Sequence, residues 1–185
     1  TLVGKLTGPG IDEAFSAPVQ WDAKGGSVFL DFKDKKLPLW SEFAPNLCKL
    51  SLSLQTPSGS DSKEIPCGFR KIAARGPELL LDGQRIFLRG THEGVTFPLT
   101  GYAPMDVEGW RRVFKILKEW GLNHLRFHSY CPPEACFTAA DEEGIYIQAE
   151  LPLWTGDLGK PGDAGRVAWI RDEAKRIFES YGNHP

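Results

Sequence analysis

Six polar or aromatic residues that could bind a substrate stand near the ends of three apolar segments. They are His92, Glu93, Arg126, His128, Glu150 and Trp154. Carboxylates and imidazoles can exchange protons, a guanidinium donates hydrogen bonds, and an indole offers a flat apolar face. Because barrel enzymes keep their chemistry at strand ends, we predict that these side chains line a substrate-binding site.

Several of these residues also have a purely structural explanation. An unpaired buried carboxylate is costly, so Glu150 should either pair with a cation such as Arg126 or face a pocket. If that pair is buried, removing one partner should cost ~3–5 kcal/mol. Trp154 could instead cap the core. Asp141, in a predicted helix, is expected to be solvated or to end the helix.

Metal binding is not expected at these positions. The stretch "HEGVT" lacks the second histidine of a zinc-protease motif. His124 and His128 would lie ~13 Å apart on a strand at ~3.3 Å per residue, too far to share one ion. The four cysteines lack metal-ligand spacing and are expected to be free buried thiols. They are Cys48, Cys67, Cys131 and Cys136. We therefore predict no metal and no other cofactor.

Hydrophobic periodicity predicts strands and helices in alternation around the candidate residues. Strands are predicted at residues 85–89, 124–128 and 145–150. A helix with apolar residues at positions 110, 113, 114, 117 and 120 should begin after Asp106 and stop at Gly121. A second helix should run from Pro132 to Gly144, with Cys136, Phe137 and Ala140 facing inward, and a third should carry an apolar stripe over residues 167–181.

Three strand–helix units with short connections imply parallel strands joined by right-handed crossovers. The earlier part of the chain has a different pattern. Leucines at 50, 52 and 54 alternate with polar residues, and residues 28–32 alternate in the same way, as strands with one buried face do. Gly- and Pro-containing breaks separate about five such runs, whereas an immunoglobulin-type sandwich has ~7 strands.

Several motifs, taken in order, resemble glycoside hydrolase family 2, the group of β-galactosidases, β-glucuronidases and β-mannosidases. They are "DGQRIFLRG", "GLNHLRFHSY", "AADEEGIYIQAE" and "YGNHP", preceded by "LPLWSEFAPNLCKLSLSL" and "CGFRKI". The resemblance covers roughly residues 37–185. It implies an immunoglobulin-like β-sandwich, incomplete here, over residues 1–75. It also implies the N-terminal part of an α/β (β/α)₈ TIM barrel, with three βα units, over residues 76–185.

The resemblance also implies a function and a limit to it. Family 2 enzymes are retaining glycosidases that cleave O-glycosidic bonds of β-linked sugars with two carboxyl groups. A complete barrel takes ~250 residues, and the family's acid/base and nucleophile glutamates are expected beyond Pro185. We therefore expect a fragment that has substrate-binding residues but no catalytic residue, and that is inactive alone.

The chain departs from the family at two places. In "HSYCPP" the histidine stands one position earlier than in the "SHYP" form common among β-galactosidases, which weakens the assignment of His128 as a ligand. The magnesium ligands that many bacterial β-galactosidases carry after the third strand have no counterpart in "LPLWTGD". The sugar and its linkage stay open.

Composition narrows the range of partners. A net charge of -2 without a basic cluster argues against nucleic acid or an anionic membrane. We expect a carbohydrate substrate for the parent enzyme, and self-association of this chain through the open edges of a partial barrel. The compartment stays open, with a periplasmic or secreted bacterial parent as one option.

Two other function classes remain alternatives. One is a non-catalytic carbohydrate-binding or interaction module. The other is a metal-dependent barrel hydrolase that uses His92, Glu93, His128 and Glu150.

Overall fold

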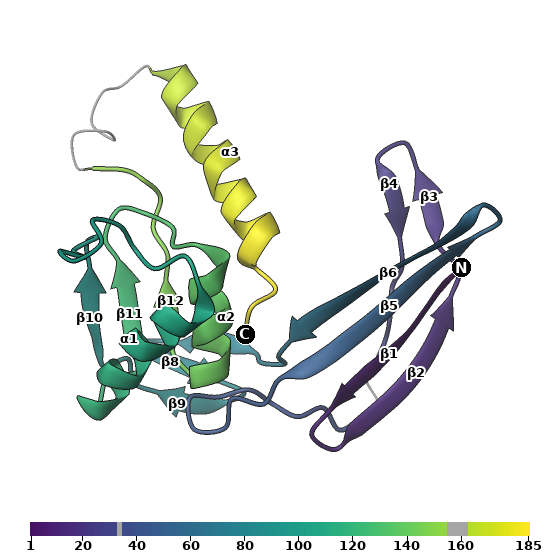
Figure 1. Ribbon diagram of the computed structural model, residues 1–185, viewed down its shortest axis with the longest axis horizontal. Helices are drawn as coiled ribbons and strands as arrows, with labels where there is room; N and C mark the ends of the chain where they lie inside the picture. The colour runs from purple at the N-terminus through teal and green to yellow at the C-terminus, as the bar shows by residue number, and fades with distance from the viewer. Residues whose placement is uncertain (33–34, 155–162) are drawn as a thin grey trace. The chain divides into compact units, whose positions relative to one another are not determined.

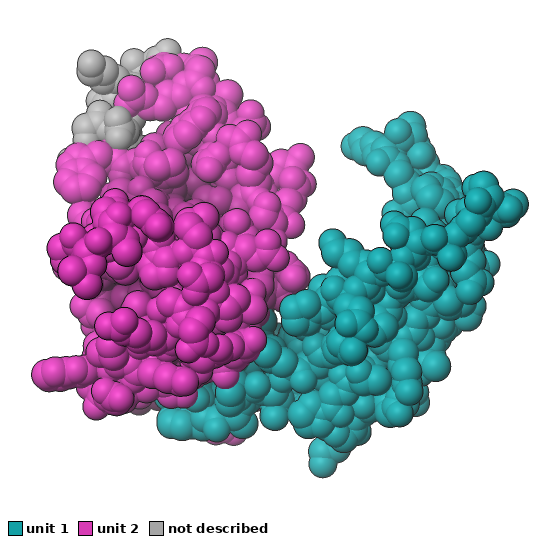
Figure 2. Space-filling view, viewed as in Figure 1, with its two compact units in different colours: residues 1–70, 185 teal, residues 71–184 magenta. Residues whose placement is uncertain are grey.

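The computed structural model describes residues 1–32, 35–154 and 163–185 (Figure 1). The chain divides into two compact units, which Figure 2 colours separately. Unit 1 comprises residues 1–70 and Pro185, and unit 2 comprises residues 71–184. None of the helices in the described ranges has the length and apolar character that crossing a bilayer requires.

Unit 1 is built on a four-stranded antiparallel sheet with the strand order β2-β1-β5-β6. Its strands are β1 (Leu2–Gly8), β2 (Ile11–Ala17), β5 (Cys48–Thr56) and β6 (Gly59–Cys67), and β3 (Gln20–Asp22) with β4 (Gly25–Ser27) forms a separate hairpin. Two-residue turns join β1 to β2 and β5 to β6, so each of these strand pairs is a tight hairpin. The strand predicted from the alternating leucines is confirmed as β5.

The core of unit 1 is small. Leu6, Ile11 and Cys48 are buried in it, and Phe32 and Leu50 pack against them. The strand predicted at residues 28–32 is wrong, because these residues form no strand in the structure. Phe32 reaches the apolar cluster while Phe29 is 86% exposed. The alternating pattern there comes from Phe32, which packs on the cluster without its segment pairing with another strand.

Unit 2 begins with a three-stranded antiparallel sheet of order β7-β8-β9. The strands are β7 (Ile72–Arg75), β8 (Glu78–Leu81) and β9 (Gln84–Ile86). Asp82 and Gly83 both have positive φ, as a tight turn of an Asp-Gly pair requires. This turn pairs Arg85 and Ile86 with Leu80 and Leu79, so the predicted parallel strand at 85–89 is wrong.

A parallel sheet of order β10-β11-β12 follows (Figure 1). Its strands and the helices between and after them are β10 (Gly90–Glu93), α1 (Val107–Glu119), β11 (His124–Phe127), α2 (Glu134–Glu143), β12 (Tyr146–Gln148) and α3 (Ala164–Tyr181). The first parallel strand therefore starts about five residues later than predicted, and His92 and Glu93 lie within it. The second and third predicted strands and all three predicted helices are confirmed.

The main core of unit 2 lies between this sheet and helices α1 and α2. Trp110 and Phe114 of α1 pack on Leu125 and Phe127 of β11, and all four are almost completely buried. Cys136 and two alanines of α2 join the cluster, which confirms Cys136 and Ala140 of the predicted inward face, whereas Phe137 is buried against Tyr181 instead. Because successive side chains of a strand point to opposite faces, Arg126 must lie on the face away from the helices.

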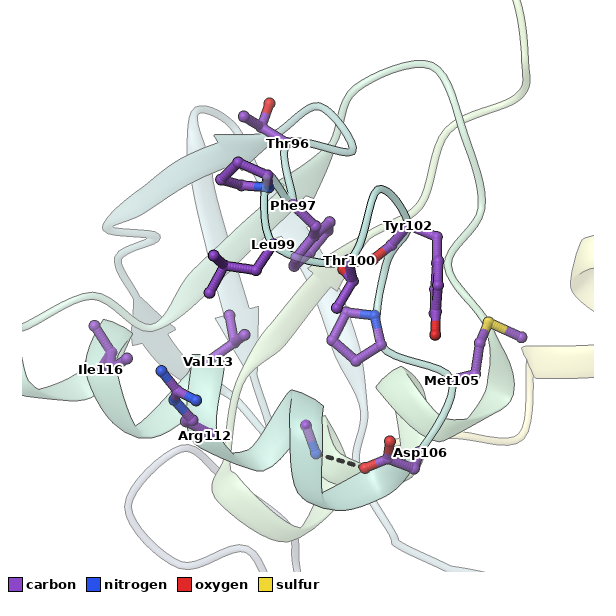
Figure 3. A pocket seen from close by; sticks show the side chains of 13 residues that line it. Thr96, Phe97, Leu99, Thr100, Tyr102, Met105, Asp106, Arg112, Val113 and Ile116 are labelled. Carbon is purple, nitrogen blue, oxygen red and sulfur yellow. Dashed lines mark hydrogen bonds between the residues drawn. The ribbon is translucent and has the colours of Figure 1, made fainter.

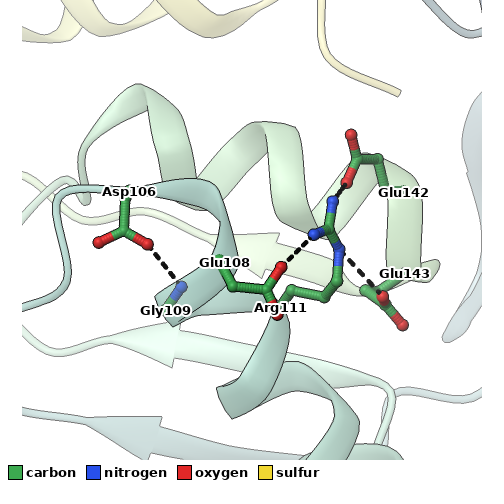
Figure 4. A network of polar contacts seen from close by, with 6 residues as sticks. All are labelled: Asp106, Glu108, Gly109, Arg111, Glu142 and Glu143. Atoms are coloured by element: carbon green, nitrogen blue, oxygen red, sulfur yellow. Dashed lines mark hydrogen bonds and ion pairs between the residues drawn. The ribbon is translucent and has the colours of Figure 1, made fainter.

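Electrostatic contacts hold α1 beside α2 (Figure 4). Arg111 of α1 forms ion pairs with Glu108 on its own helix and with Glu142 of α2, and its Nε lies 3.6 Å from an oxygen of Glu143. Lys118 donates a hydrogen bond to the carbonyl of Glu143 at 2.6 Å. These contacts reach the last turn of α2, so they fix the direction of one helix relative to the other.

The C-terminal segment packs against α2 in a way that the sequence did not predict. Asp141 is buried rather than solvated, and its carboxylate lies 2.6 Å from Nδ1 of His184. Phe137 of α2 stacks on Tyr181 with ring centroids 4.4 Å apart. Elsewhere the predicted apolar stripe of α3 is largely unpacked, and Phe178 is 76% exposed.

The N-terminus of α1 offers a direct test of its predicted cap. Asp106 accepts a hydrogen bond from the N–H of Gly109 at 2.7 Å. Asp106→Ala removes this acceptor and should lower the free energy of unfolding by ~1 kcal/mol, as measured by urea denaturation. Asp106→Asn keeps an acceptor and is the matched control. Equal losses in the two variants would contradict the capping role.

Candidate substrate-binding site

The candidate site lies on the face of the parallel sheet opposite the helices. The strand register places His92 beside Arg126 and Arg126 beside Gln148. Paired residues of neighbouring strands point to the same face, and His128 follows Arg126 with the same parity. The structure thus brings His92, Arg126 and His128 together on one face at the C-terminal ends of β10 and β11.

Arg126 and Glu150 form a two-point ion pair, which is the first of the two alternatives expected for Glu150. Nε of Arg126 lies 2.5 Å from Oε1 of Glu150, and Nη2 lies 3.1 Å from Oε2. The N–H of Ser129 donates to Oε2 at 2.8 Å, and the Gln148 amide donates to Oε1 at 3.2 Å. The Arg126 guanidinium, followed by the Ser129 N–H, lowers the pKa of Glu150. Glu150 is thus held as a carboxylate.

The pair is less buried than expected. The side chains of Arg126 and Glu150 are 39% and 22% exposed. Water reaches both groups and weakens the penalty of leaving either one alone. The predicted cost of ~3–5 kcal/mol for breaking the pair is therefore too high for this setting.

Three rings form a continuous aromatic surface next to this ion pair. The rings of His92 and His128 are perpendicular, with centroids 5.9 Å apart. The His128 ring also lies 4.9 Å from the Trp154 indole at an angle of 33°. Trp154 is 60% exposed, so it packs on His128 and not in the core. Of the stretch "LPLWTGD", residues 155–157 lie outside the described residues.

Glu93 occupies a different position from the other candidates. Its register partner is Phe127, whose side chain faces the helices. The carboxylate accepts hydrogen bonds from the Tyr130 hydroxyl and, at 2.9 Å, from the N–H of Thr96. Burial, and then the hydrogen bond to Glu93, raises the pKa of the Tyr130 hydroxyl. Glu93 therefore fixes two loops from the core side of the sheet.

The segment after β11 contributes two residues that were not among the candidates. Ser129 has a φ of 64°, a left-handed conformation that is uncommon for residues other than glycine. This turn directs its N–H at Glu150, and the next residue, Tyr130, turns back to Glu93. In the sequence, the available signal was their position directly after a buried strand, where barrel enzymes keep functional groups. The strained backbone at Ser129, which is typical of functional sites, is seen only in the structure.

The same sheet face has a shallow hollow of 440 Å³ that extends from the start of β10 and β11 to His92 and Arg126. It is lined by Leu88, Gly90, Thr91, His92, His124 and Arg126. A Cβ atom at Gly90 would lie 2.3 Å from Nδ1 of His124, so only glycine leaves room for this imidazole. Burial lowers the pKa of His124, which favours its neutral form.

A second hollow, of 520 Å³, lies between α1 and the loop that follows β10 (Figure 3). Apolar side chains of Leu99, Val113 and Ile116 point into it, and Arg112 stands at its edge. Asp106 also borders this hollow, but its carboxylate caps α1. None of the six predicted site residues lines it.

Within the described ranges, no group of three or more His, Cys, Asp or Glu side chains is arranged to hold a metal ion.

The known proteins that this chain resembles in sequence are glycosidases. The chain is 31% identical over 139 residues to a candidate β-glucuronidase of Formosa agariphila, covering 74% of this chain and 17% of that protein. It is 31% identical over 155 residues to a β-galactosidase of Lactococcus lactis, covering 80% of this chain and 15% of that protein. The chain thus spans less than a fifth of the length of these relatives. No protein-family model matches it.

Among solved structures, the β-glucuronidase of Parabacteroides merdae matches the whole chain with a TM-score of 0.80 at 24% identity, over 23% of its own length. At this identity the match shows a shared fold. The sequence relatives are a β-glucuronidase and a β-galactosidase. With the shared fold, they support a glycoside hydrolase origin for the chain.

The Arg126–Glu150 pair leads to a prediction about pH. At neutral pH, Arg126→Ala should lower the free energy of unfolding by ~1 kcal/mol, because the pair is partly exposed. Since the folded-state pKa of Glu150 is lowered, this stabilisation is present above the ordinary glutamate pKa of ~4.3 and is lost as pH falls through the lowered value. Urea denaturation at neutral and acidic pH should therefore show the two proteins converging in acid.

The matched control for this measurement is Arg112→Ala. Arg112 is an exposed arginine on α1, and its replacement removes the same charge on the helix side of the sheet, opposite the face of Arg126. If Arg126→Ala lowers the free energy of unfolding as much at acidic pH as at neutral pH, the ion-pair mechanism is contradicted. In the same variant the Glu150 carboxyl, followed by NMR, should titrate at higher pH than in the wild type.

Proposed function

We propose that this chain is part of a family 2 glycoside hydrolase that cleaves β-linked sugars with retention of configuration. Unit 1 is proposed to belong to its immunoglobulin-like sandwich, and the β10-β11-β12 sheet with its helices to the first part of its TIM barrel. The named glycosidase relatives and the parallel order of the three strands support this proposal.

The observation that carries the proposal is the clustering of polar and aromatic groups at the C-terminal strand ends. His92, Arg126, His128, Glu150 and Trp154 all meet on the sheet face that the helices leave uncovered. In a (β/α)₈ barrel this end of the strands is where active sites form. A bulky apolar cluster on this face would instead have indicated a purely structural role.

The individual groups suit the recognition of a sugar. The Trp154 indole, supported by His128, offers a flat face for the C–H side of a pyranose ring. The imidazoles of His92 and His128 can donate and accept hydrogen bonds with hydroxyl groups. Arg126 and Glu150 hold one another, so their role is to fix the strand ends in position.

Neither described carboxylate on these strands has the environment of a catalytic acid. A glycosidase general acid needs a raised pKa, whereas the pKa of Glu150 is lowered by Arg126 and Ser129. The nucleophile must be a carboxylate with an oxygen free to attack, whereas both oxygens of Glu150 already accept hydrogen bonds. Glu93 is engaged by Tyr130 and Thr96 on the core side. We therefore propose that this chain supplies binding groups, and that the two catalytic carboxylates come from other parts of the parent enzyme.

The proposal predicts binding without turnover. The chain should not hydrolyse aryl β-galactosides or β-glucuronides above the level of a heat-denatured sample, since we propose that both carboxylates of the double displacement come from other parts of the parent enzyme. Turnover well above that level would overturn the assignment of these residues to binding alone. The substrates follow the names of the two relatives.

Binding can be followed by NMR titration with the corresponding monosaccharides. The indole N–H of Trp154 and the ring of His128 should shift, and Trp154→Ala should weaken binding about fivefold or more, because stacking on an aromatic ring contributes ~1 kcal/mol or more. Trp120→Ala is the matched control, because Trp120 is 80% exposed at the end of α1. Equal effects of the two substitutions would argue against a sugar site at Trp154.

A further inference from the structure

Two cysteines in unit 1 face each other across a strand pair. Cys48 begins β5, Cys67 ends β6, and the register pairs them directly. Paired residues on neighbouring antiparallel strands carry their side chains on the same face. Accordingly, both pack in the cluster around Leu6 and Ile11. Both are free thiols in the structure.

The hydrogen-bond pattern of the ladder sets the distance between them. Pro66 has no N–H, so its pair with Lys49 belongs to the non-hydrogen-bonded class. The two classes alternate along an antiparallel ladder, so the next pair, Cys48 and Cys67, is hydrogen-bonded, with Cα atoms ~5.5 Å apart. Counting back from the two-residue turn after Thr56 gives the same parity.

That separation suits a disulfide bond. Bridged cysteines have Cα separations of ~4.4–6.8 Å, most often ~5.5–6 Å. The Cα separation therefore suits a bridge. The Cβ atoms of a directly opposed pair lie ~4.5–5.5 Å apart, whereas a disulfide needs ~3.5–4.5 Å, so the two strand ends must move together by about 1 Å. The pair is the last of the β5–β6 ladder, where such a movement disturbs the fewest neighbouring pairs. Sγ of Cys48 lies against Gly8 of β1, where a Cβ atom would approach it to 2.4 Å. Because β1 and β6 flank β5 on opposite sides, bridging also requires this side chain to rotate toward Cys67.

The two thiols differ in access. Cys48 is 3% exposed, whereas Cys67 is only half-buried at the edge of the cluster. Burial raises the pKa of both thiols, and the proximity of Cys48 adds to the rise at Cys67. The pair therefore stays protonated and reduced near neutral pH until an oxidant reaches the accessible member.

We propose that Cys48 and Cys67 are a redox modification site, which a low-molecular-weight disulfide such as oxidised glutathione converts into an intrachain disulfide. Cys67 loses its proton and attacks one sulfur of the oxidant, forming a mixed disulfide and releasing one glutathione thiolate. Cys48 then loses its proton and attacks Sγ of Cys67, which releases the second glutathione. The two protein thiols give up two electrons, and the two glutathione thiolates take up the two protons.

The new bond would close the loop of residues 48–67 and lock the register of β5 against β6. A cross-link of this kind stabilises chiefly by restricting the unfolded chain. The oxidised chain should therefore unfold at a higher temperature than the reduced chain. Unit 1 has a small core, so the effect should fall mainly on this sheet.

The full chain can be treated with oxidised glutathione at mildly alkaline pH, alkylated, digested and examined by mass spectrometry. The expected product has Cys48 linked to Cys67 and a mass lower by two hydrogen atoms. Cys131 and Cys136 act as internal controls: alkylation in denaturant should modify both of them, because no strand pairing aligns them and the burial of Cys136 protects it from the oxidant while the chain is folded.

Variants separate the two steps. Cys48→Ser should stop at one glutathione on Cys67, and Cys67→Ser should form no cross-link. The oxidised wild type should melt at least about 5 °C higher, reversibly with dithiothreitol, whereas oxidant-treated Cys67→Ser should not change. The proposal is overturned if Cys48 and Cys67 of the oxidant-treated wild type are both alkylated once the protein is unfolded in denaturant without a reductant. A stable glutathione adduct on wild-type Cys67, or a lower melting temperature after cross-linking, would also overturn it.

Discussion

The burial of one face of β11 beneath α1 determines most of what unit 2 can do. Leu125 and Phe127 pack on Trp110 and Phe114, and no water reaches this interface. Because strand side chains alternate, the burial of these two residues places Arg126 on the other face. A register shift of one residue would bury the guanidinium under the helices, so the apolar core also fixes the position of the polar site.

Two glutamates at neighbouring parts of this sheet show how the same side chain takes different tasks. Glu150 meets a guanidinium and a backbone N–H, which both favour its charged form. Glu93 instead receives the Tyr130 hydroxyl on the side that faces the core. Each carboxylate joins segments that are far apart in sequence. The strand ends are therefore positioned by hydrogen bonds from both faces of the sheet.

Local periodicity was enough to predict the helices and most of unit 2. The apolar spacing of α1, the cap at Asp106 and the left-handed Gly144 at the end of α2 all act over a few residues. The first parallel strand was misplaced because Arg85 and Ile86 have strand-like character but pair backwards around the Asp82–Gly83 turn. This shift matters for the site, since it places His92 and Glu93 within a strand and on opposite faces.

The parts that the sequence did not reveal depend on partners distant along the chain. A helical aspartate such as Asp141 has the same local pattern whether water or another residue surrounds it. Its burial depends on His184, 43 residues later, which returns to the same helix beside the stack of Phe137 on Tyr181. Burying a carboxylate is favourable only when such a partner arrives. The elements therefore follow from local spacing, whereas the role of each polar residue follows from which distant segment folds onto it.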